Sequence, residues 1–349
     1  MRNIVKISII AWVFIIGFHV DNIKACTRIV YQGPNNTILT ARSMDWKEDC
    51  KTDLWVFPRG MERNGAIGKN PFTWKSKYGS VVASAYNMSS TDGMNEKGLV
   101  ANLLWLAESE YPQWDGKKPG ISIAAWVQYV LDNFATVDEA VKAMEKRNFE
   151  IVSDMMPDGT RMATLHLSIS DANGDNAIFE YIGGELKIHH DYSYQVMTNS
   201  PIFDQQLALN DYWKNIGGTT FLPGTNRAAD RFVRASFYIN AIPKTDDIYK
   251  ATASVFSVIR NTSVPLGIST PNEPNISSTR WRTVSDHKNK IYYFEATNQP
   301  NVFWVNFKDL DFSEKASVKK LDLVSGKTYA GNTANQFVSA TPFKFIGME

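Results

Sequence analysis

A cysteine at the junction between an apolar leader and a strand-rich chain constrains this sequence most strongly. The leader, residues 1–25, has two basic residues before an apolar core from 9 to 18, and a small residue, Ala25, at its end. This order is typical of a cleaved signal peptide, and the core is too short to span a bilayer comfortably. Cleavage would make Cys26 the first residue, with a thiol and a free α-amino group. The start of the first strand would then belong to the site.

The remaining chain, 26–349, is predicted to be one domain, because the 349-residue sequence shows no linker, repeat or low-complexity run. A signal peptide predicts a periplasmic or secreted protein without stable membrane association. The leader holds three basic and one acidic residue, so the mature chain would keep 34 basic and 35 acidic residues. This balance argues against nucleic-acid binding.

Local patterns predict strands where β-branched residues gather and helices where apolar residues recur with helical spacing. The expected strands are 27–31, 37–41, 54–57, 79–86, 99–106, 164–170, 177–182, 195–198, 291–295 and 302–307. The expected helices are 121–134, a helix starting at the capping box Thr136-Val-Asp-Glu139, 229–239 and 248–259. This order predicts an α+β fold with helices outside large antiparallel sheets.

The chain has two cysteines, Cys26 and Cys50, and each permits more than one interpretation. An exported protein could join them in a disulfide, which would favour a non-catalytic periplasmic binding protein. Lipid modification of Cys26 is a further alternative, although Asn22-Ile-Lys-Ala-Cys26 is a poor lipobox. A nucleophilic Cys26 instead predicts two free thiols. The sequence has no HExxH, CxxC or GxSxG motif, so neither a metal site nor a serine nucleophile is expected.

An N-terminal cysteine needs a base and charged neighbours to act on an amide. Its α-amino group, with an ordinary pKa of about 7.7 to 8.0, could accept the thiol proton. Arg42 and Asp45 lie in Ala41-Arg-Ser-Met-Asp-Trp46, where the second predicted strand ends, and a hairpin would bring them beside Cys26. Arg42 would favour the thiolate, and Asp45 would hold the ammonium or the thiol. Without the cysteine, an ordinary surface ion pair would be the better interpretation.

Several ordered motifs resemble the choloylglycine hydrolase family, which contains conjugated bile salt hydrolases and penicillin V acylases. They are Cys26-Thr-Arg, Ala41-Arg-Ser-Met-Asp-Trp46, Asp92-Gly-Met-Asn-Glu-Lys-Gly-Leu99, Thr198-Asn-Ser-Pro201 and Asp230-Arg-Phe-Val-Arg234. The family belongs to the N-terminal nucleophile hydrolases, so the resemblance implies a four-layer αββα sandwich. It also implies hydrolysis of linear, non-peptide C–N amide bonds without a cofactor. Homo-oligomers occur in the family, and a tetramer is possible.

The resemblance assigns roles to individual residues. It implies that Cys26 is the nucleophile with Arg42 and Asp45 beside it, that Asn199 donates its side-chain amide to the oxyanion, and that Arg231 is a second active-site arginine. The backbone N–H of Trp105 would be the other oxyanion donor. The alternatives for Asn199 and Arg231 are an Asx turn and a solvated helix face. Asp92 to Leu99 is expected to be structural.

Two tryptophans bear on the substrate, which is expected to be a small N-acyl amide. Trp46 and Trp105 could wall an apolar slot for a flat acyl group, although each could instead be a core residue. The two tryptophans, the leader and the short spacing between Asn199 and Arg231 together resemble the exported Gram-negative branch of the family. Penicillin V is the favoured substrate; conjugated bile salts and N-acyl homoserine lactones remain alternatives.

Overall fold

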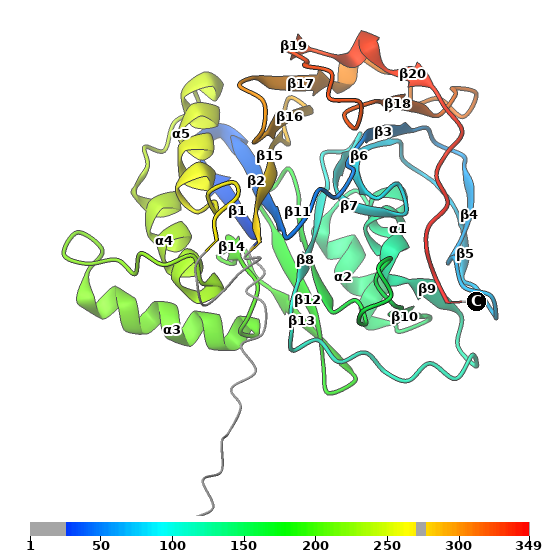
Figure 1. Ribbon diagram of the computed structural model, residues 1–349, viewed down its shortest axis with the longest axis horizontal. Coiled ribbons are helices and arrows are strands. Elements are labelled where there is room, and N and C mark those ends of the chain that lie inside the picture. The colour runs from blue at the N-terminus through cyan, green and yellow to red at the C-terminus, as the bar shows by residue number, and fades with distance from the viewer. Residues whose placement is uncertain (1–25, 270–276, 349) are drawn as a thin grey trace, which may run out of the picture.

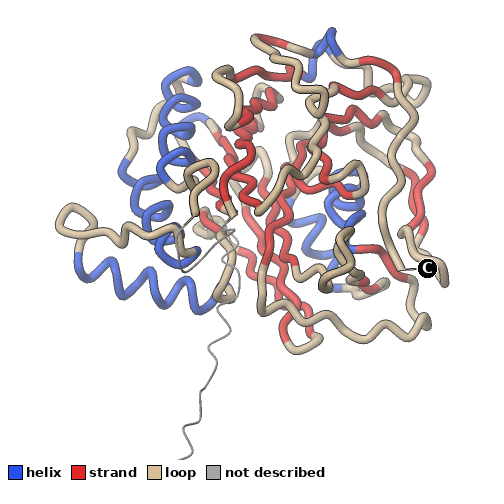
Figure 2. The backbone as a smooth tube through the Cα atoms, viewed as in Figure 1, coloured by secondary structure: helices blue, strands red, loops and turns tan. Residues whose placement is uncertain are grey.

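Two β-sheets pack face to face in this protein, and helices cover both outer faces (Figure 1). The computed structural model describes residues 26–269 and 277–348, so the predicted leader lies outside the described residues. Figure 2 shows helices on both sides of the molecule, with the strands between them. The layers confirm the predicted α+β αββα sandwich.

The first sheet contains the hairpin that positions Cys26, Arg42 and Asp45. Its strand order is β14-β1-β2-β15-β16-β17-β19, and only β17 and β19 pair in parallel. The bounds are β1 (Thr27–Gln32), β2 (Ile38–Trp46), β14 (Val196–Met197), β15 (Ser278–Asp286), β16 (Ile291–Ala296), β17 (Val302–Asn306) and β19 (Gly331–Asn332).

The second sheet is larger and follows the order β13-β12-β11-β8-β7-β6-β3-β18-β20. Its strands are β3 (Leu54–Phe57), β6 (Ser80–Ala85), β7 (Ser89–Asn95), β8 (Val100–Trp105), β11 (Leu165–Ser170), β12 (Asn176–Ile182), β13 (Glu185–His190), β18 (Lys319–Leu321) and β20 (Val338–Ser339). Two small ribbons lie beside it: β4 (Glu62–Asn64) with β5 (Thr73–Lys75), and β9 (Gly120–Ser122) with β10 (Glu150–Val152).

Five α-helices form the outer layers among the described residues. The second sheet is covered by α1 (Trp126–Asn133) and α2 (Val137–Glu145), the first by α4 (Ala228–Ala241) and α5 (Ile248–Asn261), and α3 (Phe203–Ile216) packs on α4. Two of these helices have a side-chain N-cap, as capping rules predict. Thr136 accepts from the Glu139 N–H at 3.3 Å, and Asp247 accepts from the N–H groups of Tyr249 and Lys250.

The β1–β2 hairpin brings the start of β1 to the end of β2. Its turn uses Asn35 and Asn36 in left-handed conformations (φ 53° and 55°), which asparagine adopts more readily than most residues. The register pairs Thr27 with Ser43, so Cys26 lies beside Met44 and Asp45. The predicted hairpin is confirmed, and its second strand continues to Trp46 rather than ending at 41.

A buried polar network joins the two sheets. Arg28 on β1 donates to Asn176 on β12 at 2.6 Å, and Thr40 on β2 shares a 2.7 Å hydrogen bond with Ser170 on β11. Because an unpaired polar group costs about 1 to 3 kcal/mol in such a layer, these pairs specify how the sheets align. The alignment in turn places β2 over β7 and β8, where the site lies.

Some secondary structure differs from the sequence prediction. The helix expected at 121–134 begins at Trp126, because residues 120–122 pair as β9 and 123–125 form a 3-10 turn. The Ser122 hydroxyl starts that turn by accepting from the Ala124 N–H at 3.2 Å. The strands β7 and β15 and the helix α3 were not predicted.

Candidate active site

Cys26 lies directly before β1 with its side chain in a cavity between the two sheets, and only 2% of the residue is exposed. Its Sγ is 3.5 Å from the backbone nitrogen of Asp45 and 3.7 Å from the carbonyl oxygen of Asp45. The contacts between Asp45 and the sulfur are therefore made by the main chain. The Asp45 N–H points at the sulfur, where it would stabilise a thiolate.

The main chain of Cys26 is held by two of the predicted residues. Its N–H donates to Asn199 Oδ1, and its carbonyl oxygen accepts from Arg231 Nη1 at 2.6 Å. Arg231 also donates from Nη2 to the same Asn199 Oδ1 at 3.0 Å. The guanidinium thus orients both the cysteine and the amide oxygen that contacts the cysteine nitrogen. Arg231 is fully buried, so a solvated helix face is ruled out.

Arg42 reaches the cavity from the face of β2 that meets the second sheet. It donates to the carbonyl oxygens of Thr91 at 2.6 Å and Leu103 at 2.8 Å, and its Nη1 is 3.8 Å from a carboxylate oxygen of Asp92. Its Cζ lies 5.0 Å from the Trp281 ring centroid. These partners hold a buried cation beside the thiol. Asp92, expected to be structural, is its counter-ion.

The Asp45 carboxylate lies on the opposite face of β2, toward the helices. It accepts hydrogen bonds from Ser43 at 3.3 Å and from Thr279, and it is 3.9 Å from Arg231 Nη1. Burial raises the pKa of Asp45 to about 6, although Arg231 and the two hydroxyls act in the other direction. The carboxylate therefore orients Arg231 rather than contacting the thiol.

Opposing effects act on the thiol. Burial raises the pKa of Cys26, while Arg42 and Arg231 lower it and Asp45 raises it. Because burial dominates, the thiol stays protonated unless a base accepts its proton during the reaction. The nitrogen of Cys26 itself could accept this proton if removal of residues 1–25 made it a free amine.

The main chain of Trp105 faces the same region. In the β8–β11 pair the Leu106 N–H donates to Thr164, so by strand alternation the N–H and carbonyl of Trp105 point to the other side. There Asn199 Nδ2 donates to the Trp105 carbonyl oxygen at 2.6 Å. An amide nitrogen carries two hydrogens, which leaves the second for an oxyanion. The donor roles of both residues stay predictions.

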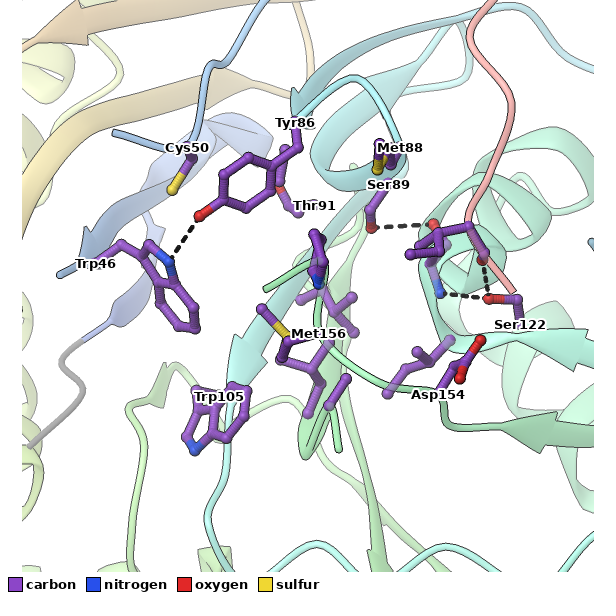
Figure 3. A pocket seen from close by; sticks show the side chains of 18 of the residues that line it. Trp46, Cys50, Tyr86, Met88, Ser89, Thr91, Trp105, Ser122, Asp154 and Met156 are labelled. Carbon is purple, nitrogen blue, oxygen red and sulfur yellow. Dashed lines mark hydrogen bonds between the residues drawn. The ribbon is translucent and has the colours of Figure 1, made fainter. Parts of the chain in front are cut away.

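The cavity beside Cys26 encloses about 100 Å³ and is lined mainly by apolar side chains (Figure 3). Trp46 and Trp105 both line it, with ring centroids 5.7 Å apart and ring planes tilted by 53°. The Trp46 Nε1–H donates to the Tyr86 hydroxyl at 3.0 Å. Both tryptophans are buried, so they are core residues and cavity walls at once. The cavity walls also include methionines and the C-terminal segment, which sequence reasoning missed.

Cys50 lines the same cavity as a second free thiol. The described structure therefore has no disulfide between Cys26 and Cys50, and the alternative of a disulfide-stapled binding protein loses its support. Among the described residues, no cluster of three or more His, Cys, Asp or Glu side chains could hold a metal ion. Nor is any described helix long and apolar enough to cross a bilayer.

Comparisons with known proteins agree with this geometry. Residues 26–325 match the model of the linear amide C–N hydrolases, choloylglycine hydrolase family. The chain is 54% identical to a penicillin V acylase of Pectobacterium atrosepticum, over 93% of both chains. It is 27% identical to a bile salt hydrolase/transferase of Clostridium perfringens, over 84% of this chain and 96% of the relative.

Solved structures give the same result. The penicillin V acylase of Agrobacterium tumefaciens superposes with a TM-score of 0.87 at 63% identity, covering 93% of this chain and all of that one. A conjugated bile acid hydrolase of Clostridium perfringens shares the fold, with a TM-score of 0.75 at 22% identity over 88% and 98% of the two chains. The protein is therefore a member of the choloylglycine hydrolase family and an enzyme that hydrolyses C–N bonds of linear amides.

Proposed function

We propose that the protein is an exported penicillin V acylase-like amidase whose nucleophile, Cys26, becomes N-terminal when residues 1–25 are removed. The arrangement around Cys26 carries this proposal. Its sulfur lies in an apolar cavity, while its nitrogen and carbonyl are held by Asn199 and Arg231. Such fixation of the main chain suits a residue whose α-amine takes part in the reaction.

The reaction follows from the residues that surround the sulfur. The α-amine accepts the thiol proton, and the sulfur attacks the substrate carbonyl carbon. The resulting oxyanion would receive hydrogen bonds from the Trp105 N–H and the second Nδ2 hydrogen of Asn199. Collapse of the tetrahedral intermediate breaks the C–N bond, and the leaving amine takes the proton from the α-ammonium. Water then hydrolyses the acyl thioester, which releases the carboxylic acid and restores the thiol.

The two arginines have different tasks in this scheme. Arg42 lies at the cavity and lowers the pKa of the thiol, so it favours negative charge on the sulfur. Arg231 acts through the main chain of Cys26 and through Asn199 Oδ1, and is a positioning residue. Asp45 keeps Arg231 oriented by the 3.9 Å ion pair.

The cavity favours an acyl group that is apolar and flat. Trp46 and Trp105 line the cavity that Cys26 also lines, and stacking on an aromatic acyl group would exploit their surface. The phenoxyacetyl group of penicillin V fits this description, and both penicillin V acylases above are more than half identical to this chain. Conjugated bile salts and N-acyl homoserine lactones are the competing substrates.

A panel of N-acyl amides tests the proposal. Protein from the exported fraction is assayed with penicillin V, glycocholate, taurocholate and N-acyl homoserine lactones, by measuring the released amine with an amine-reactive dye. We expect the highest kcat/KM for penicillin V and no release by Cys26→Ala. Faster turnover of the two bile salts would reverse the substrate assignment. The mass of the exported chain checks whether it begins at Cys26.

A further inference from the structure

The C-terminal segment, residues 343–348, runs along the candidate active-site cavity, and Ile346 is part of the cavity wall. Figure 1 shows this last stretch of chain descending beside the second sheet toward β9. The segment lies beyond residues 26–325, which match the family model. Its contacts in the structure indicate its role.

Hydrogen bonds fasten the segment to three separate places: the turn at Met88, the end of β9 at Ser122 and the loop at Gly68. The Ile346 N–H donates to the Met88 carbonyl oxygen at 3.0 Å, and the Ile346 carbonyl accepts from the Ser122 hydroxyl at 2.5 Å. Two residues later, the carbonyl of Met348 accepts from the Gly68 N–H at 2.7 Å. Ile346 is therefore held through both its N–H and its carbonyl oxygen, which fixes the position of its side chain.

Packing reinforces these hydrogen bonds. Phe343 lies against Trp55 and Phe57, with ring centroids 5.3 and 5.7 Å apart, and Phe345 packs on Phe343 at 5.0 Å. Phe343 and Phe345 are half-buried, and aromatic pairs add about 0.5 to 1.5 kcal/mol each beyond their area. The segment is thus anchored on the core of the second sheet before it reaches the cavity.

Gly347 shows how closely the segment must approach. A Cβ atom at this position would lie 1.6 Å from the carbonyl oxygen of Ala66, a distance no real contact allows. Only glycine fits here, because the obstacle is backbone rather than a movable side chain. Any larger residue would displace the segment and Ile346 with it.

Ile346 and the tryptophans occupy different parts of the cavity. In Figure 3, Trp46 and Trp105 lie on one side, while Ser122, which holds Ile346, and Asp154 lie on the other. Since Asp45, next to Trp46, contacts the sulfur of Cys26, the thiol belongs to the tryptophan side. An acyl group attached to the sulfur would extend from there toward Ile346.

Apart from the Asp154 carboxylate, whose Oδ1 accepts from the Met155 N–H at 2.7 Å, the lining near Ile346 suits an apolar chain. The Ser89 hydroxyl donates to the Ala124 carbonyl at 3.1 Å, and the Ser122 hydroxyl donates to Ile346, so both are engaged within the protein. Met88 and Met156 add unbranched side chains that can adapt to the width of a ligand. Ile346, in contrast, is branched and held by its main chain.

We propose that Ile346 is the end wall of the acyl-binding cavity, so that the C-terminal segment sets the longest apolar acyl chain that the enzyme accepts. This inference rests on the proposed function, because it takes the cavity beside Cys26 as the acyl site. The side walls adapt to chain width through methionine, whereas the end wall limits chain length.

The test compares Ile346→Ala and Ile346→Phe with the unmodified enzyme on N-acylglycines of increasing length, from about four to about fourteen carbons. Ile346→Ala removes three side-chain carbons from the wall, so it should raise kcat/KM by about 10-fold or more for acyl chains just longer than the unmodified enzyme accepts. Ile346→Phe should shorten the longest acyl chain that is accepted. Val338→Ala, at an exposed position of the same C-terminal region, is the matched control. It should leave the length profile unchanged.

A second measurement does not depend on turnover. Calorimetric binding of the corresponding fatty acids to Cys26→Ala and to the Cys26→Ala/Ile346→Ala double variant should show the same shift in length limit. If the unmodified enzyme hydrolyses neither penicillin V nor any N-acylglycine but the binding limit shifts, the proposed reaction fails and the end wall stands. Length profiles that coincide for the unmodified enzyme and Ile346→Ala, in turnover or in binding, would overturn the inference. Gly347→Ala, which displaces the segment, should widen the profile if Ile346→Ala fails to fold.

Discussion

Cys26 and Cys50 line the same cavity and are equally buried, at 2% and 3% exposed, yet only one is arranged as a nucleophile. Burial raises the pKa of both thiols. Around Cys26, the Asp45 N–H points at the sulfur, and Arg42 and Arg231 act against the effect of burial. Cys50 has one weak sulfur contact, to the Glu48 carbonyl at 3.9 Å.

The larger difference lies in the main chain. Arg231 and Asn199 hold the carbonyl and nitrogen of Cys26 by side-chain contacts, whereas the Cys50 carbonyl accepts a main-chain hydrogen bond from the distant Tyr86 N–H. Location in an apolar cavity therefore does not define the reactive thiol. The fixed nitrogen and the surrounding donors do, and the following variants separate these contributions.

Replacement of the sulfur should have the largest effect. Cys26→Ser keeps the shape of the side chain but offers a much poorer nucleophile, so kcat should fall on the order of 10³-fold or more. Released amine is the measurement, with Cys26→Ala as the fully inactive reference. Amide hydrolysis that persists at the original rate in Cys26→Ser would refute the assignment of the nucleophile.

Asn199 combines two roles that two variants can separate. Asn199→Ala removes both donor and acceptor, so kcat should drop by about 10² to 10³. Asn199→Asp keeps an acceptor for the Cys26 nitrogen but loses the donor, and should be nearly as inactive if the oxyanion contact matters most. Asn215→Ala, on the exposed side of α3, is the control. Full activity of Asn199→Asp would exclude oxyanion donation.

Two arginines on α4 allow a matched test of positioning. Arg231 contacts Cys26, while Arg234 on the same helix donates to the carbonyls of Pro223 and Thr225. Lysine cannot reproduce the forked contacts, so Arg231→Lys should lower kcat by about 10 to 10² through misplacement of the cysteine. Arg234→Lys should affect thermal stability but not kcat. Equal kinetic losses in both variants would mean that the helix, not the contact, is responsible.

Asp45 should make the free energy of unfolding depend on pH. Its pKa is raised from 3.8 to about 6, so the folded state binds this proton more tightly than the unfolded state. The resulting stability is complete below about pH 3.8 and is lost as the pH rises through about 6, by about 3 kcal/mol in total.

The measurement is urea unfolding of Asp45→Asn and the unmodified protein from about pH 4 to about pH 7. Because asparagine does not ionise, the unmodified protein should lose free energy of unfolding relative to Asp45→Asn across this range. A relative gain with rising pH would show that Arg231 and the two hydroxyls outweigh burial and stabilise Asp45 as a carboxylate, contrary to its raised pKa.

The smallest effect is expected for the second thiol. Cys50→Ala removes a buried sulfur that contacts neither the Cys26 main chain nor the predicted oxyanion donors, so kcat should stay within about threefold. Its stability should fall by about 1 to 2 kcal/mol from the lost packing. A loss of activity comparable to that of Cys26→Ser would remove the distinction between the two cysteines.

Local sequence patterns predicted the hairpin and most outer elements but not β7 and β15. Both strands face the other sheet with buried polar residues such as Asp92 and Thr283, so they lack the apolar alternation by which strands are recognised. The site residues could be found because their motifs resemble a known family. Ile346 could not, since only the tertiary path of the C-terminal segment brings it to the cavity.

The central claim is that Cys26 reacts as the N-terminal residue of the mature chain. Intact-mass spectrometry of the exported, active enzyme, quenched in acid during turnover of a slow N-acyl substrate, tests it most directly. The account predicts a chain that begins at Cys26 and carries one acyl group, which is absent in Cys26→Ala. An active enzyme that retains residues before Cys26, or an acyl group attached elsewhere, would contradict it.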